Sequence, residues 1–234
     1  MSSMGETAKH FDKNRIPDLL HMDDLKIEPN FLQLKSALQS YQLNRIKNTY
    51  SDFSNSSEFK ELTSFFFNQI YGPQDFGFRN DSIKTLFNKS HPFLRKDIVK
   101  AVENVIELND LSDEMDELLT KQLLKLGIYD LDSEVYAVAY KKCDNYKQRC
   151  YQIELMINAT QQVFKLSHVW MIGASLTALH SFTELLGIGK IMNFLYDGYQ
   201  AFHKVSDIKP FTDAIFQKEN ELNNSLFSMG NPAK

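Results

Sequence analysis

The spacing of apolar residues along the chain is that of amphipathic helices. Phe31, Leu34, Leu38 and Tyr41 recur at intervals of three and four residues, which predicts a helix from Pro29 to about residue 50. Similar spacing predicts further helices over residues 59–71, 81–87, 92–127, 132–164, 166–187, 191–202 and 210–226. No convincing pair of strands and no internal repeat interrupts this series. We therefore expect an all-α fold, a single-domain bundle of about eight or nine helices.

The polar pattern at the two ends predicts the domain boundaries. Residues 1–28 are predicted to be a loosely ordered N-terminal segment, 29–228 the helical domain, and 229–234 a flexible C-terminal tail. The N-terminal segment has neither the apolar core nor the cleavage pattern of a secretory signal. With 9 Gly, 6 Pro and 43% apolar residues, the composition favours helices over a turn-rich β fold.

A dense aromatic stretch, FFFNQIYGPQDFGFRND, covers residues 65–81. Its three consecutive phenylalanines point in different directions on a helix, so that helix is expected to be enclosed on several sides. Gly72 and Pro73 are typical of a helix end. Arg79 is either an anion-binding residue or, as we favour, a partner for helix-end carbonyls or for Asp75.

Two local details of the helix pattern can be tested. Asn55 and Glu58 have the spacing of a capping box before the aromatic helix. Asp132 or Ser133 is expected to cap one long helix reaching about residue 164.

The two cysteines, Cys143 and Cys150, are predicted to lie on this long helix. Seven residues apart, they would be separated by about 10 Å along its axis, too far for a disulfide. We expect buried, unreactive thiols and a cytoplasmic location.

The charge distribution argues against nucleic acid as a partner, because the formal net charge is −4. Residues 103–134 hold ten acidic and two basic side chains. We interpret this acidic segment as a solvated helix face, with a docking face for a basic partner as the alternative.

Residues 166–183 form an uncharged run of eighteen, which is just long enough to approach a membrane span. His168, His180 and the flanking Lys165 and Glu184 favour a central bundle helix instead, with no transmembrane segment. Peripheral membrane association through this run is a weaker alternative.

The chain lacks the usual catalytic motifs. Glu-x-x-His, His-Glu-x-x-His, the phosphate loop, the dinucleotide fingerprint and Gly-x-Ser-x-Gly are all missing. No cofactor or metal site is therefore predicted. As an alternative, His168 or His180 can hold haem or a metal, with Tyr196 or Tyr199 nearby. We favour a core position for His168 and an ordinary helical pair between His180 and Glu184.

The aromatic stretch, together with VIELNDLSDEMD, FLYDGYQAF and IFQKENEL, resembles an uncharacterised bacterial all-helical family. That family has a Phe-Phe…Tyr-Gly-Pro…Asp-Phe…Arg signature, and the resemblance spans most of the chain from about residue 30. It implies a bacterial protein with one helical domain, and it contributes no catalytic residues.

These patterns favour a non-enzymatic, cytoplasmic protein that binds a partner protein or an apolar small molecule in an aromatic-lined groove. Self-association, as a symmetric dimer, is one form of this hypothesis. The alternative is a haem- or metal-dependent helical enzyme, so the question of an enzymatic activity stays open. The candidate ligand-binding residues are Tyr71, Arg79, His168, Trp170, His180, Glu184 and Tyr199.

Overall fold

The computed structural model describes residues 29–70, 83–85, 87, 88, 95–169, 172–174 and 189–228. Every regular element in these ranges is a helix, and the predicted all-α, single-domain fold is confirmed. The principal helices are α1 (Pro29–Thr49), α5 (Lys96–Lys125), α6 (Ser133–Lys142), α7 (Tyr146–Ser167), α10 (Gly189–His203) and α11 (Lys209–Ser228). The predicted N-terminal segment 1–28 and the tail 229–234 lie outside the described residues.

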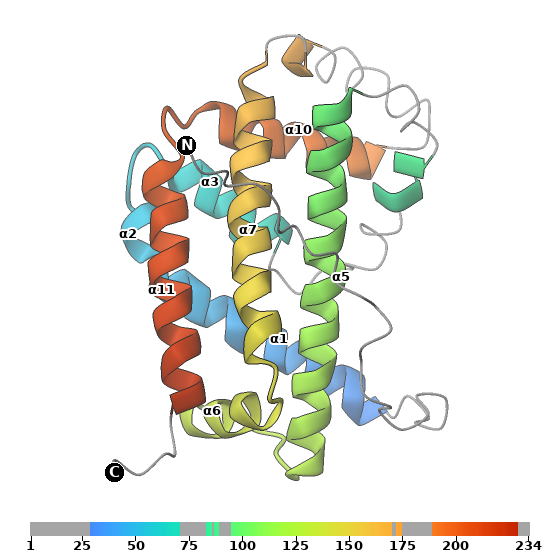
Figure 1. Ribbon diagram of the computed structural model, residues 1–234, viewed down its shortest axis with the longest axis vertical. Coiled ribbons are helices and arrows are strands. Elements are labelled where there is room, and N and C mark those ends of the chain that lie inside the picture. Colours follow the sequence, from blue (N-terminus) through green and yellow to red (C-terminus); the bar gives the residue numbers. More distant parts are fainter. Residues whose placement is uncertain are drawn as a thin grey trace, which may run out of the picture.

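Helix α7 is the centre of the bundle. It runs between α5 and α11 and packs against both (Figure 1). Helix α1 crosses this layer and contacts α5, while α10 crosses the end of the bundle where α7 finishes (Figure 1). The short helix α6 closes the opposite end and contacts both α5 and α11.

The apolar core consists of two main clusters. One is rich in aromatic residues and includes Phe59, Phe66, Phe202 and Phe211. The other is mainly aliphatic and joins α1, α5, α6 and the end of α11; its members include Leu34, Leu38, Leu119, Leu123 and Leu226. Each large apolar side chain that becomes fully buried contributes about 1.5–3 kcal/mol, so these two clusters supply the main stabilisation of the bundle.

The predicted single helix over residues 132–164 is wrong, because the chain breaks between α6 and α7. Asp132 caps α6 as expected, and its carboxylate accepts the backbone N–H groups of Glu134 and Val135. The helix then ends, and Asp144 adopts a left-handed φ of 48° before α7 begins. Aspartate is among the residues that tolerate this conformation best. The apolar spacing continues across the break because each helix buries one face, α6 in the aliphatic cluster and α7 partly in the aromatic cluster.

The break also changes the argument about the two thiols. Cys143 and Cys150 belong to different segments, and both are free. Burial raises the pKa of Cys143 to about 11, which supports the predicted lack of reactivity for this thiol.

The predicted capping box at Asn55 and Glu58 is also wrong. Asn55 ends a short helix, α2 (Ser51–Ser54), and Phe59 occupies the N-cap position of α3 (Lys60–Phe65). The Glu58 carboxylate instead accepts both the backbone N–H and the hydroxyl of Ser206. The Glu58 carboxylate therefore accepts two hydrogen bonds from a distant loop, in place of the single backbone N–H that a capping box would supply.

The aromatic helix ends in a π-helix. Helix α3 continues directly into η3 (Phe66–Ile70), so the predicted helix over this stretch is confirmed up to Ile70. Phe65 and Phe66 are buried and Phe67 is half-buried, which confirms that the helix is enclosed on several sides. Single π-helical turns are rare and frequently occur at functional sites. Gly72, Pro73 and Arg79 lie outside the described residues.

Gly198 on α10 allows the close approach of α3. A Cβ atom at this position would lie 2.8 Å from Phe65 Cζ, closer than packed atoms tolerate. A Gly→Ala change inside a helix normally stabilises by up to about 1 kcal/mol. Here we expect Gly198→Ala to lower the free energy of unfolding by about 1–3 kcal/mol, because the Phe65 ring must move within a packed cluster. Urea denaturation measures this, with Asp197→Ala on the exposed face of α10 as the control; a stabilised Gly198→Ala protein would contradict the prediction.

Candidate functional site

A partly open cavity of about 190 Å³ lies between the helices of the bundle. Its lining comes from α1, α5, α6, α7, α11 and η3, and it includes members of both core clusters. An apolar cavity of about 150 Å³ accommodates benzene, while sites for drug-sized ligands span about 300–1,000 Å³. The cavity is therefore large enough for a single ring or a short chain with a polar group.

One wall of the cavity is apolar. Phe66, Phe67 and Ile70 all line it, which places three of the five η3 residues at the site. Ile153 and Met156 of α7 add aliphatic surface. The π-helical turn thus lies directly against the cavity.

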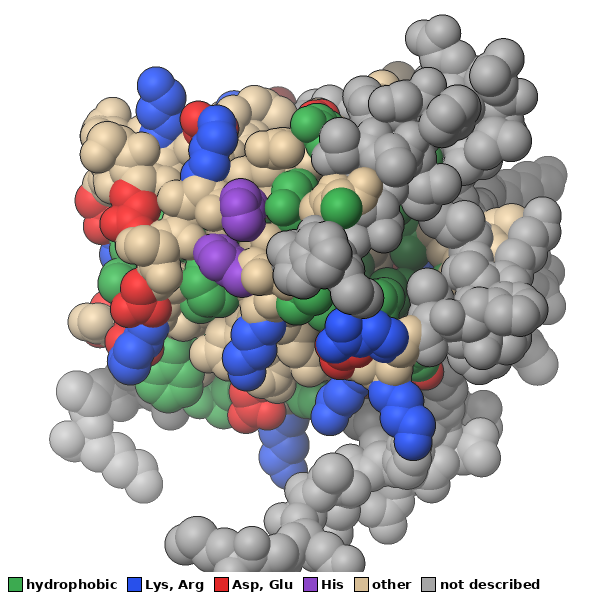
Figure 2. All heavy atoms as spheres, turned by 90° about the horizontal axis from the view of Figure 1, so that it is seen from above, with side chains coloured by type: hydrophobic (Ala, Val, Ile, Leu, Met, Phe, Trp, Pro, Cys, Tyr) green, Lys and Arg blue, Asp and Glu red, His purple; other side chains and the backbone are tan. Residues whose placement is uncertain are grey.

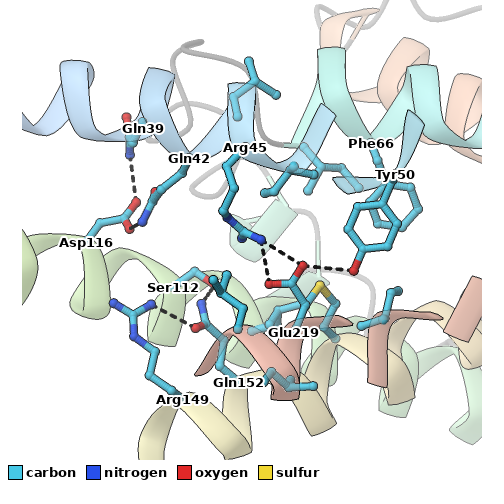
Figure 3. Close-up of a pocket in the computed structure, with 18 of the residues that line it drawn as sticks. Gln39, Gln42, Arg45, Tyr50, Phe66, Ser112, Asp116, Arg149, Gln152 and Glu219 are labelled. Atoms are coloured by element: carbon cyan, nitrogen blue, oxygen red, sulfur yellow. Dashed lines mark hydrogen bonds and ion pairs between the residues drawn. The ribbon is translucent and has the colours of Figure 1, made fainter. Parts of the chain in front are cut away.

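An ion pair between Arg45 and Glu219 lies in the middle of the site (Figure 3). Arg45 Nη1 donates to Glu219 Oε1 at 3.1 Å and lies 3.0 Å from Oε2 of the same carboxylate. The Tyr50 hydroxyl donates to the same carboxylate at 3.0 Å. Burial by itself would lower the pKa of Arg45, but the attraction of Glu219 outweighs it and the pKa lies above its usual value. Arg45 therefore stays charged and joins α1 to α11.

Asp116 of α5 faces the cavity from the other side. Gln39 and Gln42 of α1 donate side-chain N–H groups to its two oxygens, at 3.3 and 3.1 Å (Figure 3). Burial raises the pKa of Asp116 above its usual value, although the nearby positive charge of Arg149 partly opposes this effect. The site therefore contains a carboxyl group that is easier to protonate than an exposed aspartate.

Arg149 of α7 is the most unusual residue of the site. It is only 6% exposed. Its Nη1 donates to Gln152 Oε1 at 3.1 Å and its Nη2 to the backbone carbonyl of Met115 at 3.4 Å. The guanidinium carbon lies 4.7 Å from the centre of the Tyr140 ring. In the described part of the chain, however, Nε has no hydrogen-bond acceptor and no carboxylate lies within 4.0 Å of the guanidinium nitrogens.

The titration of Asp116 leads to a prediction for stability. Because its pKa is raised in the folded state, its stabilising contribution is complete below the unfolded value of 3.8 and is lost as the pH rises through the folded value. We expect Asp116→Asn and the parent protein to be similarly stable near pH 3.5. At pH 7 the variant should be the more stable, because it buries no ionised carboxylate. The asparagine oxygen still accepts from one glutamine amide, and the other amide can rotate to accept from the asparagine NH2 group. Urea denaturation at the two pH values measures this, with Glu114→Gln on the exposed face of α5 for comparison; an Asp116→Asn protein that is less stable at pH 7 would refute the argument.

The sequence-predicted candidates do not form this site. Tyr71, Arg79, Trp170, His180 and Glu184 lie outside the described residues. His168 and Tyr199 are described, but neither lines the cavity.

The predicted core position of His168 is wrong, because this residue is exposed at the C-cap of α7. Its ring lies 5.2 Å from that of His203, which stacks on Tyr199 at the same distance. Figure 2 shows the two described histidines side by side on the surface. His203 Nδ1 bonds to the backbone oxygen of Ser167 at 2.8 Å, so these rings connect α7 to α10. The described residues contain no group of three or more His, Cys, Asp or Glu side chains arranged to hold a metal ion.

The acidic segment is a solvated face, as predicted, with one important exception. Eight of its ten acidic side chains are exposed. Glu117 pairs with Lys35 and Lys121. Asp116, by contrast, faces the cavity. The overall charge of the segment does not reveal this, because a charge count says nothing about the direction of each side chain.

The sequence does contain a signal for the residues that were missed. Glu219 follows Ile215 by four residues and precedes Leu222 by three, so it lies on the apolar face of α11. Arg149 is likewise four residues before Ile153 on α7. A charged residue at a core position of a helix is the pattern that identifies this site.

None of the helices in the described ranges combines the length and apolar character needed to cross a membrane.

Comparisons with known proteins place the chain in a family without identifying a function. Neither the curated proteins nor the solved structures contain a match to the chain. Residues 21–232 match the family model described as a domain of unknown function (DUF8198), and the chain therefore belongs to that family.

Proposed function

We propose that this protein binds a small molecule in the cavity between α1, α5, α7 and α11. The observation that carries the proposal is the buried Arg149 guanidinium: Arg149 lines the cavity, and its Nε donor is closed to water and has no acceptor among the described residues. Burying an ion costs several kcal/mol unless partners replace its hydration. Two hydrogen bonds and the Tyr140 ring offset part of that cost. A ligand acceptor at Nε offsets more of it.

The composition of the lining supports binding over catalysis. Among the described lining residues, Ser112 is the only serine, threonine or cysteine, and its hydroxyl accepts a hydrogen bond from Gln152 Nε2 at 2.8 Å. The described lining contains no histidine. The described lining therefore lacks the serine–histidine or cysteine–histidine pair of the usual covalent catalysts. The mixture of one apolar wall and a few fixed polar groups is typical of a ligand pocket.

A thermal-shift screen tests the proposal. The full chain is heated with a panel of molecules of about 6 to 12 non-hydrogen atoms, covering acids, amides, alcohols and amines with ring or chain bodies. We expect some members to raise the melting temperature at millimolar concentration and to bind with a stoichiometry of one by native mass spectrometry. Met156→Trp, which fills the cavity from α7, should remove the shift while leaving the far-ultraviolet helix signal unchanged.

The control is a substitution on the exposed face of α11. Phe216→Trp adds an indole where the side chain is 61% exposed and does not line the cavity. Ligand shifts in this variant should equal those in the parent protein. If no member of the panel binds the parent protein, or if Met156→Trp binds as well as the parent, the proposed function is wrong.

A further inference from the structure

We infer that the ligand carries a carboxylate, which Arg149 binds, and an apolar ring or short chain that lies against η3. This inference rests on the proposed function and specifies its ligand class. It follows from three features of the site: the donors that Arg149 leaves unused, the saturation of the cavity's own carboxylates, and the position of the apolar wall.

Arg149 has the donors that a carboxylate requires. A guanidinium carries five N–H groups in one plane, and the two observed bonds use one hydrogen on Nη1 and one on Nη2. The N–H of Nε is buried and has no acceptor among the described residues. A carboxylate is planar and has two oxygens that match the spacing of neighbouring guanidinium N–H groups. A hydroxyl or an amide oxygen satisfies one of these donors but supplies no charge.

The acidic groups of the site are already satisfied. Glu219 is paired with Arg45 and accepts from Tyr50. Asp116 accepts from the Gln39 and Gln42 amides. The remaining acid of the lining, Asp113, is exposed and pairs with Lys35 at 2.6 Å. Arg45 has Glu219 as its ion-pair partner, whereas the charge of Arg149 reaches Asp116 only at longer range, with no carboxylate of the described residues within 4.0 Å of its nitrogens. This difference favours a ligand whose acidic group meets Arg149 over an amine.

The arrangement of the walls determines the rest of the ligand. In Figure 3, Arg149 and Asp116 lie on one side of the pocket and Phe66 and Tyr50 on the other, with Arg45 and Glu219 between them. A ligand whose acidic group meets Arg149 therefore extends its body toward the aromatic wall. The cavity volume of about 190 Å³ limits that body to approximately one ring. Benzoate has this size and polarity and is a suitable probe.

The experiment compares matched probes on the full chain. Isothermal titration at pH 7 measures the affinities of benzoate, benzamide and benzylamine, which differ in charge but little in size. We expect benzoate to bind the parent protein at least about 10-fold more tightly than benzamide, with benzylamine the weakest. Arg149→Leu should reduce the ratio of the benzoate affinity to the benzamide affinity to about 1. Arg149→Lys should retain part of this preference, because lysine keeps the positive charge but lacks the planar pair of N–H donors of the guanidinium.

Arg95→Leu is the matched control, because Arg95 is an exposed arginine paired with Asp97 at the start of α5. The benzoate-to-benzamide affinity ratio of Arg95→Leu should equal that of the parent protein. Equal binding of benzoate and benzamide by the parent protein would refute the carboxylate inference but leave the cavity as a binding site. Failure of all three probes and of the wider panel would refute the proposed function itself. If Arg149→Leu does not fold, the comparison of Arg149→Lys with the parent protein tests the role of Arg149. An unchanged benzoate-to-benzamide affinity ratio in Arg149→Lys would refute a role for the paired guanidinium N–H donors.

Discussion

Replacing Glu219 with alanine is expected to lower the free energy of unfolding by about 3 kcal/mol. The substitution leaves the Arg45 guanidinium inside the bundle without its carboxylate and removes the acceptor of the Tyr50 hydroxyl. Side-chain exposure is 11% for Glu219 and 23% for Arg45, so water replaces the lost partner only in part. Guanidinium chloride denaturation, followed by far-ultraviolet circular dichroism, measures the change.

A double-mutant cycle separates the ion pair from the loss of packing. Glu219→Leu removes the charge and keeps most of the side-chain volume, and Arg45→Met does the same for its partner. We expect the double variant to be more stable than Glu219→Leu alone, because replacing both members of a buried pair removes the orphaned charge. Tyr50→Phe should cost only about 1 kcal/mol, the value of one hydrogen bond. Additive effects in the cycle, or a loss below about 1 kcal/mol for Glu219→Ala, would show that the pair does not stabilise the fold.

The helices of the bundle were predictable because apolar periodicity is a local property. The spacing of Phe31, Leu34, Leu38 and Tyr41 predicted α1, which the structure places at Pro29–Thr49. Pro210 predicted the start of α11, since proline is tolerated in the first turn of a helix, where its missing N–H has no intrahelical partner. Gly127 was predicted to end α5, and its φ of 67° is the left-handed conformation of such a helix end. In each case, the deciding interaction lies within a few residues along the chain.

The break between α6 and α7 was not predictable from the same pattern. Periodicity reports which residues face the core, and that face continues from Ala139 to Ile153 although the backbone turns at Asp144. The position of the turn depends on how α6 packs across the ends of α5 and α11, which only the assembled bundle determines.

The candidate site was missed for a related reason. Arg45 and Glu219 are 174 residues apart, and Gln42 and Asp116 are 74 apart. No local pattern pairs such residues. Charge counting then assigned Asp116 to a solvated face and overlooked Arg149, because it treats every charged residue in a segment alike. The orientation of each charge relative to the apolar stripe is the more useful measure.

The aromatic stretch that dominates the sequence leads to the second large effect. Phe66→Ala is expected to lower the free energy of unfolding by about 3–5 kcal/mol, because Phe66 is 7% exposed and its removal creates a void in a packed core. The Phe66 ring lies 5.9 Å from that of Phe202 and 5.6 Å from that of Phe211, so the void opens between α10 and α11.

The neighbouring residue is a built-in control for this substitution. Phe67 follows Phe66 on the same π-helical turn and also lines the cavity, but it is only half-buried. Phe67→Ala should therefore cost less than half as much stability, since less apolar surface leaves the core. Chemical denaturation of both variants, with crystal structures or cavity-binding measurements to confirm the void, tests the comparison. Equal losses from Phe66→Ala and Phe67→Ala would mean that the turn itself, rather than the packing of Phe66, controls stability at this wall of the cavity.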